Sequence, residues 1–143
     1  MSVSGSAEFE RWLFEYERKL NKAVRKEITK TANKIRNRVM ASMNAPAQGR
    51  LYIREPGQNR SREHRASAPG DAPAKDSGAL VESIAYTRPK PLSARVSSDI
   101  FYAARLEFGD MRVQARPSFR PATDAEREPF AEAIREAMRR AAE

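Results

Sequence analysis

The sequence predicts an α+β fold, in which a long N-terminal amphipathic helix and a C-terminal helix pack on a small, mainly antiparallel sheet. Three observations support this class. Apolar residues recur every three or four positions over residues 7–43, as they do along the buried face of a helix. The same spacing returns within residues 120–143. Between these segments, short runs around Pro89 and Pro91 alternate between apolar and polar residues, as strands do.

The N-terminal helix is expected over residues 7–43. Ser6 is the expected N-cap, because its hydroxyl can accept a hydrogen bond from a free N–H group of the first turn. Glu8 and Glu10 follow at positions where the helix dipole favours acids. Asn44 and the proline shortly after it are expected to end the helix.

The length of this helix has a consequence for the surface it presents. At 1.5 Å per residue it is roughly 55 Å long, which exceeds the diameter of a compact domain of this size. Part of its apolar face is therefore expected to contact another molecule, with Trp12 and Tyr16 in that contact. The alternative is a bend or break near Asn21 or Thr31, which would let the chain cover its own apolar face.

Residues 45–76 are expected to form a flexible basic loop, because they are rich in Pro, Gly, Ser and Arg and lack a periodic apolar pattern. Only residues 51–55 resemble a short strand. His64 is expected at the surface, since it has no companion ligands in the sequence. The loop is either solvated or in contact with a nucleic acid through its arginines, which are Arg50, Arg54, Arg60, Arg62 and Arg65.

Short elements are expected after the loop. Residues 76–84 predict a short helix, which Asp76 or Ser77 can cap and which turns Leu80 and Ile84 inward. The alternating runs that follow predict an antiparallel pair of strands with prolines at an edge.

The next segment leaves two possibilities open. Residues 100–108 form either a short helix or a continued strand, and Gly109 allows a turn after them. Residues 111–117 alternate as another strand would. The aromatic residues expected in the core are Tyr102, Phe108 and Phe119.

Two prolines precede the C-terminal helix. Pro117 and Pro121 each fix φ and disfavour helical geometry at the residue before them, so residues 114–121 are expected to form a stiff, extended segment. Pro129 is tolerated in a first turn. The regular part of the helix is therefore expected to begin near Glu128, after a kinked leading turn.

Basic residues gather on one part of the chain. The formal net charge is +8, and residues 18–38 carry nine basic residues against the single acid Glu27. Such a block indicates a polyanionic or acidic partner, or else a solvated helix face. The basic residues expected close to DNA in the first case are Lys22, Arg25, Lys26, Lys30 and Lys34 of this block, with Arg50, Arg54, Arg60 and Arg62 of the loop.

Other chemistry is absent from the sequence. There is no cysteine, one histidine and no glycine-rich phosphate loop, so no catalytic residue, cofactor site or metal site is predicted and an enzyme is not expected. No apolar run approaches the roughly 20 residues of a membrane span, and the first ten residues have no export signal. No membrane partner is expected.

Three short motifs carry a resemblance to a known family. "PAKDSGALVESI" fits the pattern Pro-x-x-x-[Ser/Thr]-Gly-x-Leu-x-x-Ser-Ile, "YAARLEFG" fits Tyr-Ala-x-x-x-Glu-Phe-Gly, and "ARPSFRPA" fits Ala-Arg-Pro-Phe-x-x-Pro-Ala before a C-terminal helix. In this order, after a long N-terminal helix, they resemble the tail-completion (neck, or head–tail joining) family of long-tailed bacteriophages and prophages. The resemblance covers roughly residues 5–143, with Ser118 where the family usually has Phe.

The resemblance implies a single-domain structural protein of the virion, residues 1–143, made in the host cytoplasm and placed at the head–tail junction. It would form a homo-oligomeric ring, expected to be hexameric, between a tail-tube or terminator protein and the head connector or portal-side proteins. Double-stranded DNA would pass through the ring and touch it without sequence specificity.

The resemblance and the residue pattern together suggest an interface. Arg116 and Arg120 are expected to pair with acids, with Glu107 as the first candidate, inside the subunit or across the ring. The residues expected at the interface are Arg116, Arg120, Glu107 and Phe119, with Trp12 and Tyr16 of the long helix. The alternative function is a basic, sequence-independent nucleic-acid-binding protein, in which residues 18–38 and 48–66 bind the phosphate backbone.

Overall fold

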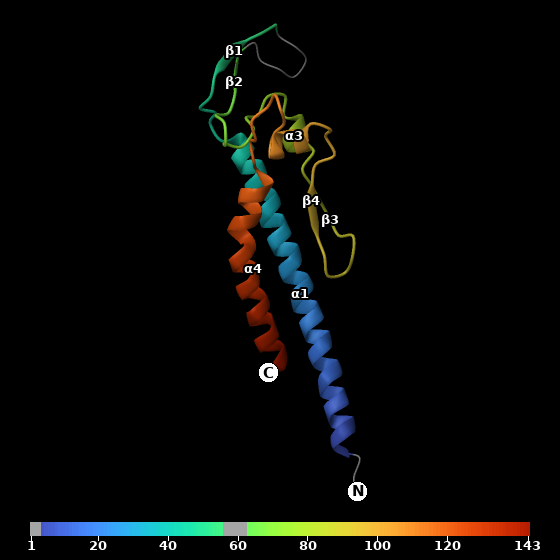
Figure 1. Cartoon of the computed structure of the whole chain (residues 1–143). Helices are drawn as coiled ribbons and strands as arrows, with labels where there is room; N and C mark the ends of the chain where they lie inside the picture. The colour runs from blue at the N-terminus through green and yellow to red at the C-terminus, as the bar shows by residue number, and fades with distance from the viewer. Residues whose placement is uncertain (1–3, 56–62) are drawn as a thin grey trace.

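The fold is an elongated α+β structure dominated by two antiparallel helices (Figure 1). The computed structural model describes residues 4–55 and 63–143. Helix α1 (Ser4–Asn44) runs the length of the molecule, and helix α4 (Phe119–Ala142) returns along it. All the shorter elements lie beside the C-terminal half of α1, so the N-terminus of α1 stands clear of them (Figure 1).

Helix α1 is one unbroken helix of 41 residues, about 60 Å long at 1.5 Å per residue. The alternative of a break near Asn21 or Thr31 is therefore wrong. Its start also differs from the expectation, because the helix already includes Ser4 and Ser6 then lies inside the first turn. Ser6 is thus not the N-cap, and the first turn contains no acid.

Two separate antiparallel pairs replace the single sheet that the sequence suggested. Strand β1 (Leu51–Ile53) pairs with β2 (Glu63–Arg65), and β3 (Ala85–Thr87) pairs with β4 (Arg95–Ser97). The expected strand at 51–55 is thus confirmed over three residues. Its partner β2 falls in the segment expected to be a loop, and the register sets Tyr52 opposite His64.

Helix α2 (Ala79–Glu82) and helix α3 (Ala103–Phe108) lie beside the upper end of α1 (Figure 1). Gly78 precedes α2 with φ +91°, a left-handed conformation that a residue with a Cβ adopts only with strain. This glycine, rather than Asp76 or Ser77, occupies the N-cap position. For residues 100–108, the helical alternative is confirmed over α3.

The expected strand at 111–117 is wrong. The Asp110 carboxylate accepts hydrogen bonds from the backbone N–H groups of Arg112 and Val113, both at 2.8 Å, and these bonds hold a tight turn. The same two bonds, followed by the nearby Arg105 guanidinium, lower the pKa of Asp110. A local side-chain acceptor has therefore replaced a strand partner for these backbone groups.

The extended segment expected at residues 114–121 is wrong over its last three residues, since only residues 114–118 precede the helix. Helix α4 begins at Phe119, so Pro121 is its third residue, and a missing N–H costs nothing there because first-turn N–H groups have no partner within the helix. Pro129 lies in the interior of α4 and not near its start. The helix therefore begins nine residues earlier than the Glu128 predicted from Pro129.

The core lies where the upper end of α1 meets α2 and the start of α4. Val39 and Met43 of α1 pack with Val81, Ile84 and Ala122. Farther along α4, the buried residues are Glu126 and then the small alanines Ala137 and Ala141, and small side chains let two helix backbones approach closely. The large buried side chains are therefore concentrated at this end of the molecule, which we call the upper body. The paired helices α1 and α4 extend from it, and the hydrophobic residues buried along the rest of the pair are alanines.

We expect the substitution Ile84→Ala to lower the free energy of unfolding by about 2–5 kcal/mol, because it removes a large side chain that is only 2% exposed. Chemical denaturation followed by circular dichroism measures this change. The control is Leu92→Ala, since Leu92 is 49% exposed; its effect should stay near about 0.5 kcal/mol. If both substitutions lowered the free energy of unfolding equally, Ile84 would not belong to the core.

Candidate interaction site

The start of α4 is held by a carboxylate from α3. Glu107 Oε2 accepts hydrogen bonds from the backbone N–H groups of Ser118 (2.8 Å) and Phe119 (3.1 Å), and Oε1 accepts one from Arg120 (2.8 Å). These donors are the ones that a helix N-terminus leaves without partners, and the helix dipole adds to the attraction for a negative charge. Glu107 therefore caps α4 from outside the helix.

Gly109 makes this approach possible. Its φ is +74°, and a Cβ there would lie 2.8 Å from the backbone nitrogen of Ala115 and 2.9 Å from the carbonyl oxygen of Val113. The chain can therefore fold tightly back, and the N–H of Arg116 donates to the carbonyl of Leu106 at 2.6 Å. This return brings residues 116–120 beside α3. We call the contact between α3 and the start of α4 the capped junction.

The expected pairing of Glu107 with arginines does not occur within this chain. Arg116 donates through its guanidinium to the carbonyl oxygen and the hydroxyl of Ser67. Arg120 Nε lies 3.9 Å from an Asp124 carboxylate oxygen at the exposed surface. Glu107 pairs instead with backbone N–H groups, because the start of α4 offers three converging donors. The interpretation missed this because it treated residues 114–121 as extended.

The aromatic residues of the junction divide between core and surface. Phe119 is partly buried against the core, and Tyr102 is also partly buried. Phe108, which was expected in the core, is 80% exposed. The cap explains the difference, because Glu107 faces the start of α4 and the next residue on a helix points about 100° away from it.

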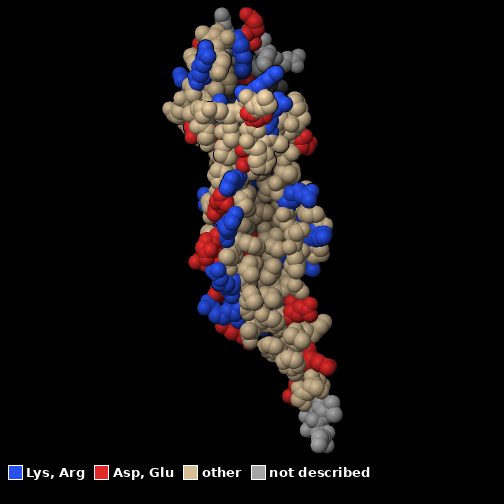
Figure 2. Space-filling view, viewed as in Figure 1, with Lys and Arg blue, Asp and Glu red and all other residues tan. Residues whose placement is uncertain are grey.

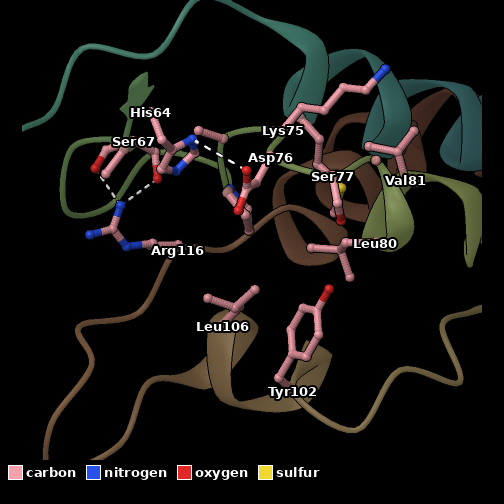
Figure 3. Close-up of a pocket in the computed structure, with 15 residues that line it drawn as sticks. His64, Ser67, Lys75, Asp76, Ser77, Leu80, Val81, Tyr102, Leu106 and Arg116 are labelled. Atoms are coloured by element: carbon pink, nitrogen blue, oxygen red, sulfur yellow. Dashed lines mark hydrogen bonds and ion pairs between the residues drawn. The ribbon is translucent and has the colours of Figure 1, made fainter. Parts of the chain in front are cut away.

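A pocket of about 350 Å³ lies between the capped junction and the segment that follows β2. Tyr102 and Leu106 project into it from α3 towards Leu80, and Arg116 reaches Ser67 at one side (Figure 3). Several of its polar residues, among them Ser67, Asp76 and Arg116, already have partners. Asp76 binds Arg54 through an ion pair, and His64 Nδ1 lies 3.9 Å from the same Asp76 oxygen.

The contacts around this pocket join separate segments of the chain. Arg54 and His64 both lie against the carboxylate of Asp76, and these contacts tie the β1–β2 pair to the residues before α2. Within the described residues, no three His, Asp or Glu side chains lie close enough to hold a metal ion. The contacts with Asp76 stabilise the junction between the β1–β2 pair and α2.

The N-terminal end of α1 carries an exposed aromatic stripe. The rings of Phe9 and Trp12 stack at 6.0 Å between centroids, and those of Trp12 and Tyr16 stack at 5.4 Å. Phe9 is 60% exposed and Trp12 49% exposed. The last turn of α4 reaches only to the level of Lys19 and Ala23, with which it lines a shallow groove. Residues 4–18 project beyond it, and we call them the N-terminal arm.

The basic residues of α1 fall into two groups. Lys34 and Arg38 face α4, where the carboxylate of Glu126 lies 3.8 Å from Lys34 Nζ and 2.6 Å from Arg38 Nε. Lys30 lies 3.9 Å from Glu27. Of the α1 residues expected close to DNA, those that are exposed and have no ion pair within the described part of the chain are Lys22, Arg25 and Lys26.

Of the loop arginines, Arg54 is committed to Asp76, and the Arg50 guanidinium lies 5.4 Å from the centre of the Tyr52 ring. Arg60 and Arg62 lie outside the described residues. The exposed residues Lys22, Arg25 and Lys26 are thus the ones that the structure leaves open to a polyanion. The other proposed DNA contacts within the described residues, Lys30, Lys34, Arg50 and Arg54, lie beside acidic or aromatic side chains.

The sequence interpretation missed Glu126, Ser67 and Arg36. Glu126 is an acid that is only 4% exposed; its position four residues after Ala122, on the apolar face of the helix, could have identified it. Arg36 donates to the carbonyl of Ile84 at 3.2 Å, and Ser67 receives Arg116. No pattern in the sequence marks these last two, since their partners are 48 and 49 residues away.

Comparison of the chain with protein-family models, with curated proteins and with solved structures finds no match. Among the described residues, no helix is both long enough and apolar enough to cross a membrane.

We expect Glu107→Ala to lower the free energy of unfolding by about 1–3 kcal/mol, because three backbone donors at the start of α4 lose a charged acceptor. Glu128→Ala is the control, since that side chain is 70% exposed and its ion pair with Arg135 is equally exposed; its effect should not exceed about 0.5 kcal/mol. Urea denaturation of both variants decides the matter. A Glu107→Ala protein as stable as the parent would mean that the cap is dispensable.

Proposed function

We propose that this protein is a structural component of a tailed-bacteriophage virion, which forms a homo-oligomeric ring at the head–tail junction. The observation that carries the proposal is the N-terminal arm. The rings of Phe9 and Trp12 are exposed, the Tyr16 ring that stacks on Trp12 is partly exposed, and no other helix or strand of the described residues lies beside them. Large exposed apolar patches on a soluble protein mark interaction sites.

The residues of the three motifs support the same proposal. Gly78 comes from the first motif, Glu107 and Gly109 from the second and Arg116 from the third, and together they fix α2, α3 and the start of α4 around one point. They have architectural tasks, since each sets a backbone conformation or a contact between elements. A set of motifs with such tasks suits a building block whose shape is its function. The role we assign is therefore not enzymatic.

The charge distribution fits the passage of DNA. Lys22, Arg25 and Lys26 occupy neighbouring turns of α1 and are exposed. A duplex that moves through a ring needs contacts that do not depend on sequence, and unpaired lysine and arginine side chains provide them. The partners on either side would be a tail-tube or terminator protein and a connector protein of the head.

Virion assembly tests the proposal directly. In a phage or induced prophage that carries this gene, deletion should leave separate heads and tails, and electron microscopy of the lysate should count few joined particles. In parent particles, cryo-electron microscopy should find the chain as a ring between head and tail. Normal particle yield after deletion, or particles that lack the chain, would rule the proposal out.

Arg116→Ala should reduce joining in the same assay more than Lys90→Ala does. Arg116 is partly buried and binds Ser67, so its loss frees the segment after β2 from the capped junction and leaves buried acceptors without a donor. Lys90 is exposed in the β3–β4 turn. Joined particles counted by electron microscopy, with the protein level checked on a blot, give the measurement. Equal counts of joined particles for the two variants would show that head–tail joining does not depend on the contact between Arg116 and Ser67.

A second candidate function is a sequence-independent nucleic-acid-binding protein, which the unpaired Lys22, Arg25 and Lys26 favour. If these residues contact phosphates, changing all three to Gln should weaken binding of duplex DNA by the purified protein. It should also reduce the slope of log affinity against log salt by up to about 2.7. Exposed Arg135 and Arg139, changed to Gln, are the control. DNA binding lost in the triple variant while particles still join would favour this second function over the first.

A further inference from the structure

The surface of the upper body contains an apolar groove along α1. It has a volume of about 410 Å³ and lies between α4 on one side and the β3–β4 hairpin on the other. Figure 2 shows this region as a strip without charged atoms between charged flanks. We call this feature the apolar groove. The residues that line it are mainly Ile28, Thr31, Ile35, Leu92, Val96 and Phe130.

The apolar groove matches the N-terminal arm in length. Phe9 and Tyr16 are seven residues apart on α1, and so are Ile28 and Ile35, so both apolar stripes extend for about 10 Å. Along the arm the apolar residues follow the i, i+3, i+4, i+7 spacing through Trp12 and Leu13. An amphipathic helix that binds in a groove presents its side chains with this spacing.

The charges of the two surfaces are opposite in sign. The arm carries four glutamates against two arginines, which gives a net charge of −2. The hairpin that forms one flank of the groove, residues 85–97, carries Arg88, Lys90 and Arg95 and no acid. If the arm of another molecule lay in the groove, its glutamates would come close to the basic residues of the hairpin, and the opposite charges would attract.

The arm cannot enter the groove of its own chain. Tyr16 and Ile28 lie on the same unbroken helix, 12 residues or about 18 Å apart. To fold back, α1 would have to break between them. Both halves of the contact therefore exist on every molecule, but only a different molecule can bring them together.

We propose that the N-terminal arm of one copy of this chain binds in the apolar groove of a second copy. The contact places Phe9, Trp12 and Tyr16 against Ile28, Ile35 and Val96 of the neighbour. Repeated in one direction, it generates a closed ring, as heterologous contacts do when the rotation closes. The ring form of this contact rests on the function proposed above; the contact itself does not.

Cross-linking tests the contact, since the chain has no natural cysteine. The full-length variant with Leu13→Cys and Thr123→Cys places one thiol in the arm and one at the groove. A short bismaleimide should yield covalent oligomers of more than two copies. The control, Leu13→Cys with Ala125→Cys, uses an exposed site two residues away that does not line the groove, and should give at least about tenfold less product.

The cross-linked products separate the two proposals. Products that stop at two copies support the arm–groove contact and contradict the ring. Equal cross-linking of both variants, or none in a protein that sediments as an oligomer, overturns the contact while a ring built on other surfaces survives. A protein that sediments only as a monomer at all accessible concentrations also overturns the contact.

Single substitutions provide an independent measurement. Trp12→Ser should weaken self-association in sedimentation velocity by about tenfold or more, because large aromatic side chains dominate such contacts. Phe14→Ser is the matched control: Phe14 is 66% exposed, but it lies with Arg18 and Lys22 on another face of α1. Its association should equal that of the parent. If Phe14→Ser weakens association as strongly as Trp12→Ser does, the proposed face is wrong.

Discussion

The direction of α4 depends on one carboxylate. Glu107 binds the backbone N–H groups of the N-cap Ser118 and of the first two residues of that helix, and it does so from α3, so these bonds fix one element against another. Because α4 starts at this point and runs along α1, the cap also sets the groove between α4 and the β3–β4 hairpin. The arrangement of the α1–α4 pair and the shape of the apolar groove therefore both depend on the capped junction.

A second charged contact joins α4 to α1. Glu126 is almost fully buried between the helices and faces Lys34 and Arg38. A carboxylate buried without a cation would be strongly destabilising. Because Lys30 lies one turn before Lys34, the charges favour registers in which Glu126 faces this row of basic residues. The alanine-lined contact between the two helices has no such preference, since small apolar residues fit one another in many registers.

The success of prediction from sequence varied with the distance over which each signal acts. The periodic spacing that predicted α1 is local, and it located that helix within a few residues at each end. The β3–β4 pair was found for the same reason. The conformational preferences of Pro117, Pro121 and Pro129 predicted a later helix start, because they describe each proline alone. Glu107, which lies 11 residues before Ser118, stabilises a helix start at Phe119 that these preferences did not predict.

The candidate site was harder to predict because its contacts are distant in sequence. Arg116 was recognised as important, but its partner Ser67 is 49 residues away and belongs to a segment with no distinctive pattern. Glu107 was recognised as an unusual acid, and its partners turned out to be backbone groups that no side-chain pattern reveals. The exposed stripe at Trp12 was anticipated because a helix of that length exceeds what one small body can cover.

The projection of α1 beyond α4 gives the molecule the mechanics of a lever. Helix α4 holds α1 as far as Lys19 and Ala23, whereas the first turn of α1 lies about 22 Å farther along the helix. A tilt of about 10° at this point displaces the tip by about 4 Å, close to the width of one side-chain layer. Small adjustments of packing around this point are thus converted into atomic-scale travel at Phe9. An assembly of such levers can change its diameter without unfolding any of its parts.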